Sequence, residues 1–257
     1  MSSPGDDLEF ALELADAADD ITMSRFRSGD LVVDRKPDRS PVTDADLAVE
    51  AAIRAEVAAK RPADAVAGEE QGGEIGHGRT WVVDPIDGTK NFLRGGTIWA
   101  TLIALVDGGE PIAAVVSAPA MRRRWLASAG NGTWVEDPLQ RQSVSAISSL
   151  ADAWLSTTDL GSWREYQTQQ AYLDLVDACW ESRAYGDFWQ HCLVAEGVID
   201  VAAEPIANTW DLAAVQLLVT EAGGRFTDLS GEPGFAGGSA LASNGLLHDA
   251  ALEILRR

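Results

Sequence analysis

One short segment limits the possible folds most strongly, because it joins a buried strand to two acidic residues. Residues 80–96 read TWVVDPIDGTKNFLRGG. The apolar run at 81–83 is typical of a buried β-strand. Asp84 follows it directly, and Pro85 has no N–H group with which to continue a hydrogen-bonded ladder. We therefore expect the chain to leave the sheet here and to project Asp84 and Asp87 from a turn.

The residues after Asp87 favour binding of an anion beside a cation. Gly88 permits close approach of the backbone, and a helix that begins near Thr89 would present free N–H groups to an anion. Converging carboxylates repel one another and would also repel a phosphate. Mg²⁺ would remove this conflict, because it prefers carboxylate and phosphate oxygens. Taken alone, the segment is equally compatible with an ordinary Asp-Gly turn whose acids are solvated.

Two further acidic positions strengthen the metal interpretation. Glu69 and Glu70 follow Gly68 at the end of an apolar run, so a second acidic pair leaves a strand end or bend. Asp211 lies in the first turn of a long apolar helix. An aspartate in that position stabilises a helix by about 0.3–1 kcal/mol without any ligand, so Asp211 alone does not indicate a site.

Composition restricts the class of protein and its partners. The chain has 257 residues, of which 46% are hydrophobic, enough for one large domain or two packed halves. Its 40 acidic and 20 basic residues give a formal charge of −20, which argues against nucleic acid or an anionic membrane as a partner. The first ten residues lack a secretory pattern and no apolar run is long enough to span a membrane, so we expect a cytoplasmic protein. Cys179 and Cys192 lack a Cys-x-x-Cys spacing and are expected to be buried, reduced thiols.

Hydrophobic periodicity predicts the main elements. Helices are expected at about 7–26, from 43 onward, and at 172–179, 188–198 and 212–222. Strands are expected at 79–83, 98–106, 112–117, 154–157, 199–203 and 224–227, with prolines keeping 34–41 irregular. The turn sequence DGGEP predicts an antiparallel meander. A segment rich in Gly, Gln and Ser at 131–149 suggests two sub-domains, 1–145 and 146–257, that share a cleft.

Three segments together resemble the inositol-monophosphatase-like superfamily: Gly68-Glu69-Glu70, WVVDPIDGTKNF at 81–92, and WDLAA at 210–214. The resemblance implies a layered αβαβα sandwich of α+β and α/β character, with a metal-binding cleft between two sub-domains. It also implies two or three Mg²⁺ ions and hydrolysis of a small phosphate ester by in-line attack of a metal-activated water. Members of the superfamily are commonly homodimers.

The resemblance assigns roles only to residues that match the family's motifs. The implied metal ligands are Glu69, Asp84, the backbone carbonyl of Ile86, Asp87 and Asp211. The implied phosphate contacts are Asp87, Gly88, Thr89, Lys90 and Asp211, although Lys90 could equally be a solvated lysine in the first turn of a helix. Thr89 and Glu69 match the pair that orients and deprotonates the attacking water. Asp44 resembles an outer acid that supports a bound water or a weaker extra metal.

The leaving alcohol is less well specified. The superfamily acts on inositol phosphates, fructose bisphosphate, adenosine 3′,5′-bisphosphate and histidinol phosphate. In inositol-type members small residues follow the glycine that matches Gly186, whereas here Asp187 and Phe188 follow it, which disfavours a polyol. Histidinol phosphate carries an ammonium and an imidazole, which an extra carboxylate would suit. Glu204 matches a position that contacts the leaving group. The residues expected to select substrate are Arg183, Gly186, Asp187 and Glu204.

The segments RAYGDF, CLVAEG, AAEP and WDLAA are most similar to the actinobacterial histidinol-phosphate phosphatases of this superfamily. Two alternatives stay open at this level: an inositol-1-monophosphatase or other small phosphomonoesterase, and a regulatory protein-binding member that retains a phosphatase site. Arg183 could be a surface charge, and Asp187 a helix cap. The histidines have no partner at a telling spacing and are expected to be surface or core residues: His77, His191 and His248.

Overall fold

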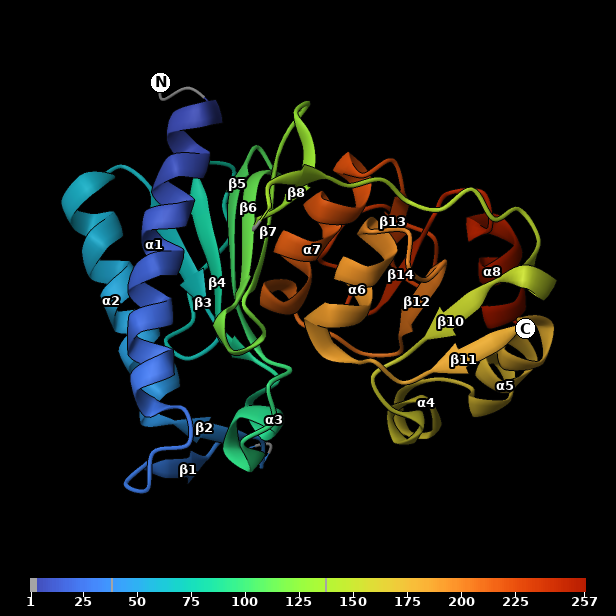
Figure 1. Cartoon of the computed structure of the whole chain (residues 1–257), viewed down its shortest axis with the longest axis horizontal. Coiled ribbons are helices and arrows are strands. Elements are labelled where there is room, and N and C mark those ends of the chain that lie inside the picture. The colour runs from blue at the N-terminus through green and yellow to red at the C-terminus, as the bar shows by residue number, and fades with distance from the viewer. Residues whose placement is uncertain (1–3, 38, 137) are drawn as a thin grey trace.

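The computed structural model describes residues 4–37, 39–136 and 138–257. Its larger sheet has seven strands that lie in chain order (Figure 1). These are β3 (Ala65–Gly68), β4 (Thr80–Asp87), β5 (Ala100–Asp107), β6 (Glu110–Ala118), β7 (Arg123–Ser128), β8 (Gly132–Val135) and β9 (Gln140–Arg141). Only the β3–β4 pair in this sheet is parallel, so the expected antiparallel meander is confirmed.

The second sheet has five strands and a mixed topology. In spatial order they are β11 (Glu181–Arg183), β10 (Trp154–Ser156), β12 (Val201–Glu204), β14 (Ala240–Ser243) and β13 (Arg225–Thr227). Strand β10 is parallel to β11 and β12, whereas β14 is antiparallel to β12 and β13. The chain passes from one sheet to the other between Arg141 and Trp154. We propose the division into sub-domains 1–145 and 146–257 on this basis.

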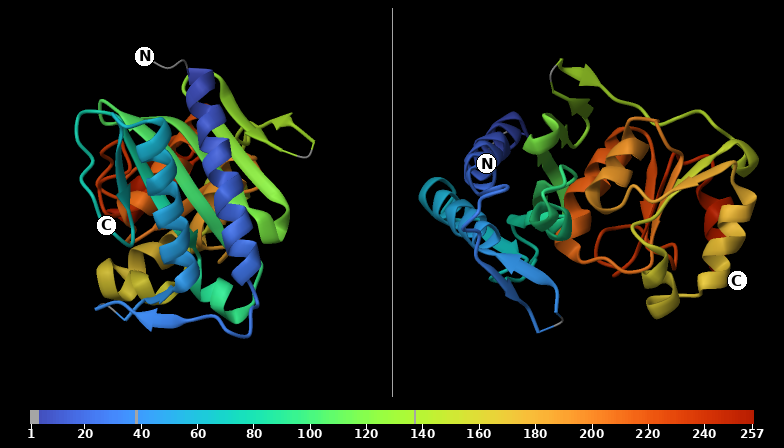
Figure 2. Two further views of the ribbon diagram at one scale, coloured as in Figure 1. Left: turned by 90° about the vertical axis from the view of Figure 1, so that its left-hand side faces the viewer. Right: turned by 60° about the horizontal axis from the view of Figure 1, so that its bottom comes forward.

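Helices complete five layers, visible in Figures 1 and 2. The helices α1 (Pro4–Arg25) and α2 (Asp44–Lys60) cover the outer face of the larger sheet. The helices α6 (Asp187–Ala195) and α7 (Thr209–Glu221) lie between the sheets. The outer face of the second sheet is covered by α4 (Leu160–Tyr166), α5 (Gln169–Ala178) and α8 (His248–Leu255). The expected αβαβα sandwich is confirmed.

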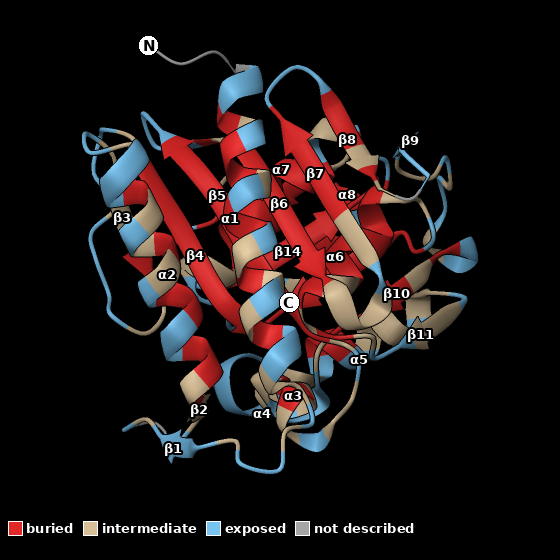
Figure 3. Ribbon diagram, turned by 60° about the vertical axis from the view of Figure 1, so that its left-hand side comes forward, coloured by how far each residue is buried: buried red, intermediate tan, exposed pale blue. Residues whose placement is uncertain are grey.

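The central strands are buried on both faces, as their red colour in Figure 3 shows. On β4, Trp81 and Val83 join the core beneath α1 and α2, where the Trp81 ring packs edge-on against Phe10 with centroids 5.2 Å apart. Val82 points the opposite way, into the core that contains α7. A strand covered on both faces needs apolar residues at every position, which explains the unbroken apolar run in the sequence.

Strand β4 corrects the expectation that the chain leaves the sheet at Pro85. The strand continues to Asp87 through an irregularity, with Asp84 opposite Leu102 and Asp87 opposite Ala100. Three residues of β4 thus span the same length as two residues of β5, as in a β-bulge. The proline is accommodated in the bulge, and the two aspartates stay attached to the sheet.

Other differences concern short elements. The segment 34–41, expected to be irregular, takes part in a small antiparallel pair formed by β1 (Val33–Arg35) and β2 (Pro41–Thr43). The sequence analysis did not predict β7, β8, β9, β11, β14, α4 or α8, which have between two and eight residues each and carry little periodic signal. Helix α3 (Thr89–Arg94) begins where an anion-binding helix was expected. Two 3₁₀ turns, Pro119–Met121 and Leu150–Asp152, complete the chain.

Two further expectations can be compared with the described residues. None of the helices among them is both long and apolar enough to cross a membrane. Both cysteines are free thiols, but only Cys192 is buried, while Cys179 is half-buried.

The larger sheet supplies a stability test with a matched control. Leu105 on β5 is fully buried, whereas Leu246 is 62% exposed. We expect Leu105→Ala to lower the free energy of unfolding by about 2–5 kcal/mol, since it removes buried methyl groups and leaves a cavity. Leu246→Ala should cost less than about 0.5 kcal/mol. Urea unfolding measures both, and similar losses for the two variants would contradict the described core.

Candidate active site

Parallel pairing of β3 and β4 brings two acidic segments to the same edge of the larger sheet. Gly68 is the partner of Val83, so Glu69 and Asp84 leave the paired region side by side. The Glu69 N–H donates a hydrogen bond of 3.2 Å to the Val83 carbonyl oxygen, which extends the pairing by one residue. The position of Glu69 is therefore set by strand register.

Local hydrogen bonds fix the bulge that carries the two aspartates. The Ile86 N–H donates to Asp84 Oδ1 at 3.0 Å, and the Thr101 hydroxyl donates to the Pro85 carbonyl at 2.8 Å. These bonds occupy backbone groups that a regular ladder would have paired. Asp84 is only 2% exposed, so its carboxylate is held inside the protein at the end of the apolar strand.

A buried glutamate shapes the turn that contains Glu69. Glu50 on α2 is fully buried and accepts hydrogen bonds from the N–H groups of Glu70 at 2.7 Å and Gln71 at 3.0 Å. A Cβ atom at Gly68 would lie 2.4 Å from the Glu50 Cδ atom, so only glycine fits there without displacement. The Gly68-Glu69-Glu70 motif thus needs a glycine for packing against Glu50 as well as the two acids that follow it.

Helix α7 supplies the acid from the second sub-domain. Asp211 occupies the third helical position, and the Asn208 N–H donates to its Oδ2 atom at 2.7 Å, forming a capping box. Oxygen atoms of Asp84, Asp87 and Asp211 lie within 4.8 Å of one another. We call these three residues the carboxylate cluster. Two of its members come from one strand and the third from a helix more than 120 residues later in the chain.

The electrostatics of the carboxylate cluster indicate a cation site. Burial raises the pKa of Asp84 well above its usual value, and Glu69, Asp87 and Asp211 raise it further. Burial also raises the pKa of Asp87, with Asp187 and Asp211 adding to the effect. Burial and Glu69 raise the pKa of Asp211 to about 6. Buried acids that repel one another fit a hard divalent cation, because its charge would stabilise their ionised forms.

Glu69 lies beside this cluster and has a basic partner. Its carboxylate adjoins Asp84, and its Oε1 atom lies 2.6 Å from Lys36 Nζ. The same ammonium lies 2.7 Å from Glu70. Burial would lower the pKa of Lys36, but the two glutamates raise it overall. Lys36 therefore supplies a positive charge at the outer side of the carboxylates.

The turn after Asp87 has a backbone that favours glycine. Gly88 has φ of 82°, and a Cβ atom there would lie 2.9 Å from the Ile98 carbonyl oxygen. The Thr89 hydroxyl donates to the Ile86 carbonyl at 2.9 Å, so its oxygen has lone pairs left to accept another hydrogen bond. The residues expected to contact phosphate thus form one continuous turn beside the carboxylates.

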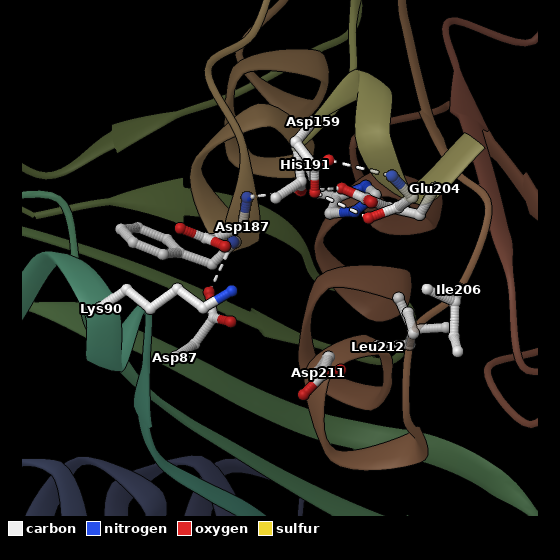
Figure 4. A pocket seen from close by; sticks show the side chains of 13 residues that line it. Asp87, Lys90, Asp159, Asp187, His191, Glu204, Ile206, Asp211 and Leu212 are labelled. Atoms are coloured by element: carbon white, nitrogen blue, oxygen red, sulfur yellow. Dashed lines mark hydrogen bonds between the residues drawn. The ribbon is translucent and has the colours of Figure 1, made fainter. Parts of the chain in front are cut away.

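Most predicted site residues line two adjoining cavities. The metal cleft, as we name the outer cavity, contains Glu69, Asp84, Ile86, Asp87, Gly88, Thr89, Lys90, Gly186, Asp187 and Asp211. The inner pocket shares Asp87, Lys90, Thr158, Asp159, Asp187 and Asp211 with it. It adds Glu204 and His191, together with Ser162, Phe188, Ile206, Ala207 and Leu212. In the view of Figure 4, Asp87 and Asp211 lie at one end of the inner pocket and Glu204 and His191 at the other.

One hydrogen bond joins β4 to α6 beside the inner pocket, and several others connect residues of the pocket wall. The Phe188 N–H, at the start of α6, donates to Asp87 Oδ2 at 2.6 Å. The Asp187 N–H donates to the Thr158 hydroxyl at 3.0 Å, and that hydroxyl donates to Glu204. The Gln190 amide also donates to Glu204. A polar network therefore runs along the pocket wall to Glu204.

Two predicted residues lie outside both cavities. Asp44 forms an ion pair with Arg25 at 2.6 Å, because the first position of α2 turns its side chain toward the end of α1. Arg183, on the edge strand β11, is exposed, pairs with Glu181 and lies over the Trp154 ring at 5.7 Å. The structure thus does not bring either side chain to the site where the sequence analysis placed it.

A second acid in the first turn of α2, Asp46, is buried and lies close enough to Glu69 for their charges to interact. It accepts a hydrogen bond from the Thr43 N–H at 2.7 Å, as expected of a capping box. Burial, with a contribution from Glu69, raises the pKa of Asp46 to about 6. In the sequence Asp44 and Asp46 are equally plausible, since both fall in the first turn of the helix. Only the direction of the helix, set by packing against β4, separates them.

Comparison with known proteins agrees with this geometry. The model of the inositol monophosphatase family matches residues 6–257. The chain belongs to the inositol monophosphatase family. Among curated relatives, a histidinol-phosphatase of Mycobacterium tuberculosis is 52% identical over 256 residues, which cover 98% of this chain and 97% of the relative. A histidinol-phosphatase of Streptomyces coelicolor is 48% identical over 259 residues, with the same coverage.

Solved structures of the inositol monophosphatase family share the fold. An inositol monophosphatase from Zymomonas mobilis superposes with a TM-score of 0.88 at 31% identity and covers 100% of both chains. The IMPase of Thermotoga maritima has a TM-score of 0.86 at 29% identity, over 98% of this chain and 97% of that one. The layered sandwich is therefore the fold of the family.

Sequence reasoning missed several residues of this site. Lys36 was not selected, because a lysine before a proline in a loop carries no signal of its own. Thr158 lies just after β10. Its position near the end of a strand was the only feature of the sequence that could have marked it as a site residue. His191 was expected to be a surface or core residue, whereas it is buried and lines the inner pocket. The other two histidines agree with that expectation: His77 is exposed and His248 is buried between Ser243 and Thr227.

The raised pKa of Asp211 gives a pH-dependent prediction for the protein in EDTA. The pKa of Asp211 is about 6 in the folded protein and 3.8 in the unfolded chain. Between these two pH values Asp211 therefore binds more protons in the folded protein than in the unfolded chain. Stability contributed by Asp211 is therefore present at low pH and is lost as pH rises through about 6. Asp211→Asn should thus stabilise the metal-free protein at pH 7, by up to about 3 kcal/mol, and this gain should shrink toward pH 4.

Urea unfolding of the wild type and Asp211→Asn at pH 7 and pH 4.5 measures this difference. Asp107→Asn, at an exposed position on β5, serves as the matched control and should show no such trend. A gain that is the same at both pH values would contradict the described burial of Asp211.

Proposed function

We propose that this chain is a Mg²⁺-dependent histidinol-phosphatase that converts L-histidinol phosphate and water to L-histidinol and phosphate. The observation that carries the proposal is the acidic inner pocket next to the carboxylate cluster. Besides Asp87 and Asp211, the pocket contains Asp159, Asp187 and Glu204. A pocket with this charge suits an alcohol that bears an ammonium group better than a neutral polyol. The curated relatives with the same name support this substrate.

The residues present fit a Mg²⁺ site. We propose Glu69, Asp84, Asp87, Asp211 and the Ile86 carbonyl as the groups that would hold two or three ions, all of them oxygen ligands. When bound, Mg²⁺ would neutralise charge on the phosphate and lower the pKa of a water molecule. The raised pKa values of Asp84 and Asp87 support this assignment, because both carboxyl groups are costly to ionise without a nearby cation.

The chain's own residues then orient the attacking water. The Thr89 hydroxyl donates to the Ile86 carbonyl, so its oxygen is oriented to accept a hydrogen bond from the water. Glu69 would take the proton from that water, and its ion pair with Lys36 would hold the carboxylate in position. Gly88, Thr89 and Lys90 would hold the phosphate, which leaves no need for a covalent intermediate on a side chain.

The second sub-domain would bind the leaving alcohol. Glu204 is buried and receives hydrogen bonds from Thr158 and Gln190, which fix its carboxyl group at the inner end of the pocket. Burial raises the pKa of Glu204 well above its usual value, and an ammonium group of the substrate would favour the ionised form. Gly186 and Asp187 would complete the wall at the start of α6, with Asp87 held by the Phe188 N–H.

Assembly and location also remain proposals. We propose a homodimer in the cytoplasm, with a small phosphate ester as the main ligand. The edge strand β11 and the neighbouring Trp180, which is 69% exposed, are features that a second copy could cover.

The substrate is tested with a panel of phosphate esters. With Mg²⁺ present, phosphate release from L-histidinol phosphate should have a higher kcat/KM than release from inositol 1-phosphate or adenosine 3′,5′-bisphosphate, by at least about 100-fold, because the inner pocket has acids for the ammonium group. Preference for inositol 1-phosphate would overturn the substrate assignment. No turnover of any ester would favour a regulatory protein-binding role.

The metal ligands are tested by removing one charge at a time. Asp84→Asn and Asp211→Asn should each lower kcat/KM by at least about 100-fold, because each removes a carboxylate from the cluster. Circular dichroism establishes that the variants are folded, and Asp177→Asn, at an exposed position on α5, is the matched control. Folded variants that release phosphate at the wild-type rate would exclude this site.

A further inference from the structure

The inner pocket contains a histidine that the proposed reaction does not use. His191 on α6 is 2% exposed and lines the pocket together with Glu204. Its Nδ1 atom is buried and has no hydrogen-bond partner among the described residues. A buried polar atom without a partner is unfavourable, and it is uncommon in folded proteins unless a ligand or water completes it. Nδ1 is covered in the ligand-free structure, so a ligand in the pocket would supply its missing partner only if the ring turned toward the cavity that it lines.

The ring of His191 is neutral near pH 7. Burial lowers its pKa to about 4, and its ring packs at a tilt against Phe226 with centroids 5.7 Å apart. A neutral imidazole has one N–H donor and one nitrogen acceptor. It can thus form a hydrogen bond of either direction with a ring nitrogen, and it adds no positive charge that would repel an ammonium group.

The shape of the inner pocket favours a flat ring. Its volume is about 210 Å³, roughly the space of seven water molecules, so it accepts a small alcohol but not a chain segment. Phe188, Ile206, Ala207 and Leu212 form apolar parts of its wall. The faces of an aromatic heterocycle can contact such side chains while its nitrogens reach polar groups at the edge.

We propose that His191 is a specificity-determining residue that hydrogen-bonds a ring nitrogen of the leaving alcohol. This inference rests on the proposed function, in which the alcohol is histidinol. Glu204 then pairs with the ammonium group, and His191 recognises the imidazole. The two contacts together distinguish a heterocyclic amino alcohol from an inositol, because an inositol has neither an ammonium group for Glu204 nor a ring nitrogen for His191.

The test compares KM and kcat for two esters. His191→Leu removes both ring nitrogens, and it should raise KM for L-histidinol phosphate by about 10- to 100-fold while kcat changes by less than about 2-fold. Hydrolysis of glycerol 2-phosphate, whose leaving group lacks a ring, should be unchanged. His191→Gln keeps a donor and an acceptor and should recover part of the loss. His77→Gln, at an exposed position, is the matched control.

Direct binding provides a readout besides turnover. Calorimetric titration with L-histidinol should show weaker binding to His191→Leu and intermediate binding to His191→Gln, while titration with inorganic phosphate should give the same affinity for all variants. Should His191→Leu fail to fold, the His191→Gln variant carries the comparison by itself.

The outcomes separate this inference from the proposed function. An unchanged KM for L-histidinol phosphate, or an equal loss for both esters, would overturn the role of His191 while leaving the substrate assignment intact. A wild-type protein that does not prefer L-histidinol phosphate in the substrate panel would overturn both.

Discussion

Mutual repulsion among buried carboxylates is the constraint on which this structure depends. Asp84, Asp87 and Asp211 approach one another where little water can screen them, and the pKa of each is raised as a result. Such a cluster is retained only where the surrounding fold holds its members in place. The buried strand β4, the capped start of α7 and the Phe188 N–H on Asp87 provide that support. The carboxylate cluster by itself opposes folding. The free energy that the packed core contributes to folding offsets this repulsion and keeps the three acids in place.

The β4 bulge shows how a small irregularity determines the site. In a regular strand, side chains three positions apart face opposite sides of the sheet. The extra residue between Asp84 and Asp87 changes this alternation, so that both carboxylates can reach Asp211 on the same side. Pro85 is compatible with the bulge because no ladder hydrogen bond is required of its nitrogen. The sequence Asp-Pro-Ile-Asp therefore places two carboxylates close to each other on one side of the sheet.

Features determined by neighbouring residues could be predicted from the sequence, whereas features determined by distant packing could not. The apolar run of β4 and the acids at strand and helix ends depend on local chemistry, and the structure contains them as expected. The choice between Asp44 and Asp46 depends on which side of α2 packs on the sheet. Lys36 pairs with two glutamates after β3, and the His191 ring packs against Phe226 on β13, so no spacing along the chain could reveal these contacts. The family resemblance predicted site residues best where the motif residues are neighbours in the sequence. It predicted them least well in the inner pocket.

The hydrogen bond between the Phe188 N–H and Asp87 joins the acidic edge of the larger sheet to the wall of the inner pocket. The strand edge that carries Asp84, Asp87 and Glu69 belongs to the larger sheet, whereas the wall around Glu204 belongs to α6, β12 and the loop after β10. Substitutions in that wall can alter which alcohol is accepted without moving the acids on β4. The donor of this hydrogen bond is a backbone N–H, which every residue except proline has. The bond can therefore be kept when side chains in the pocket wall are substituted. This arrangement explains in physical terms how one scaffold can give rise to enzymes for chemically unrelated alcohols.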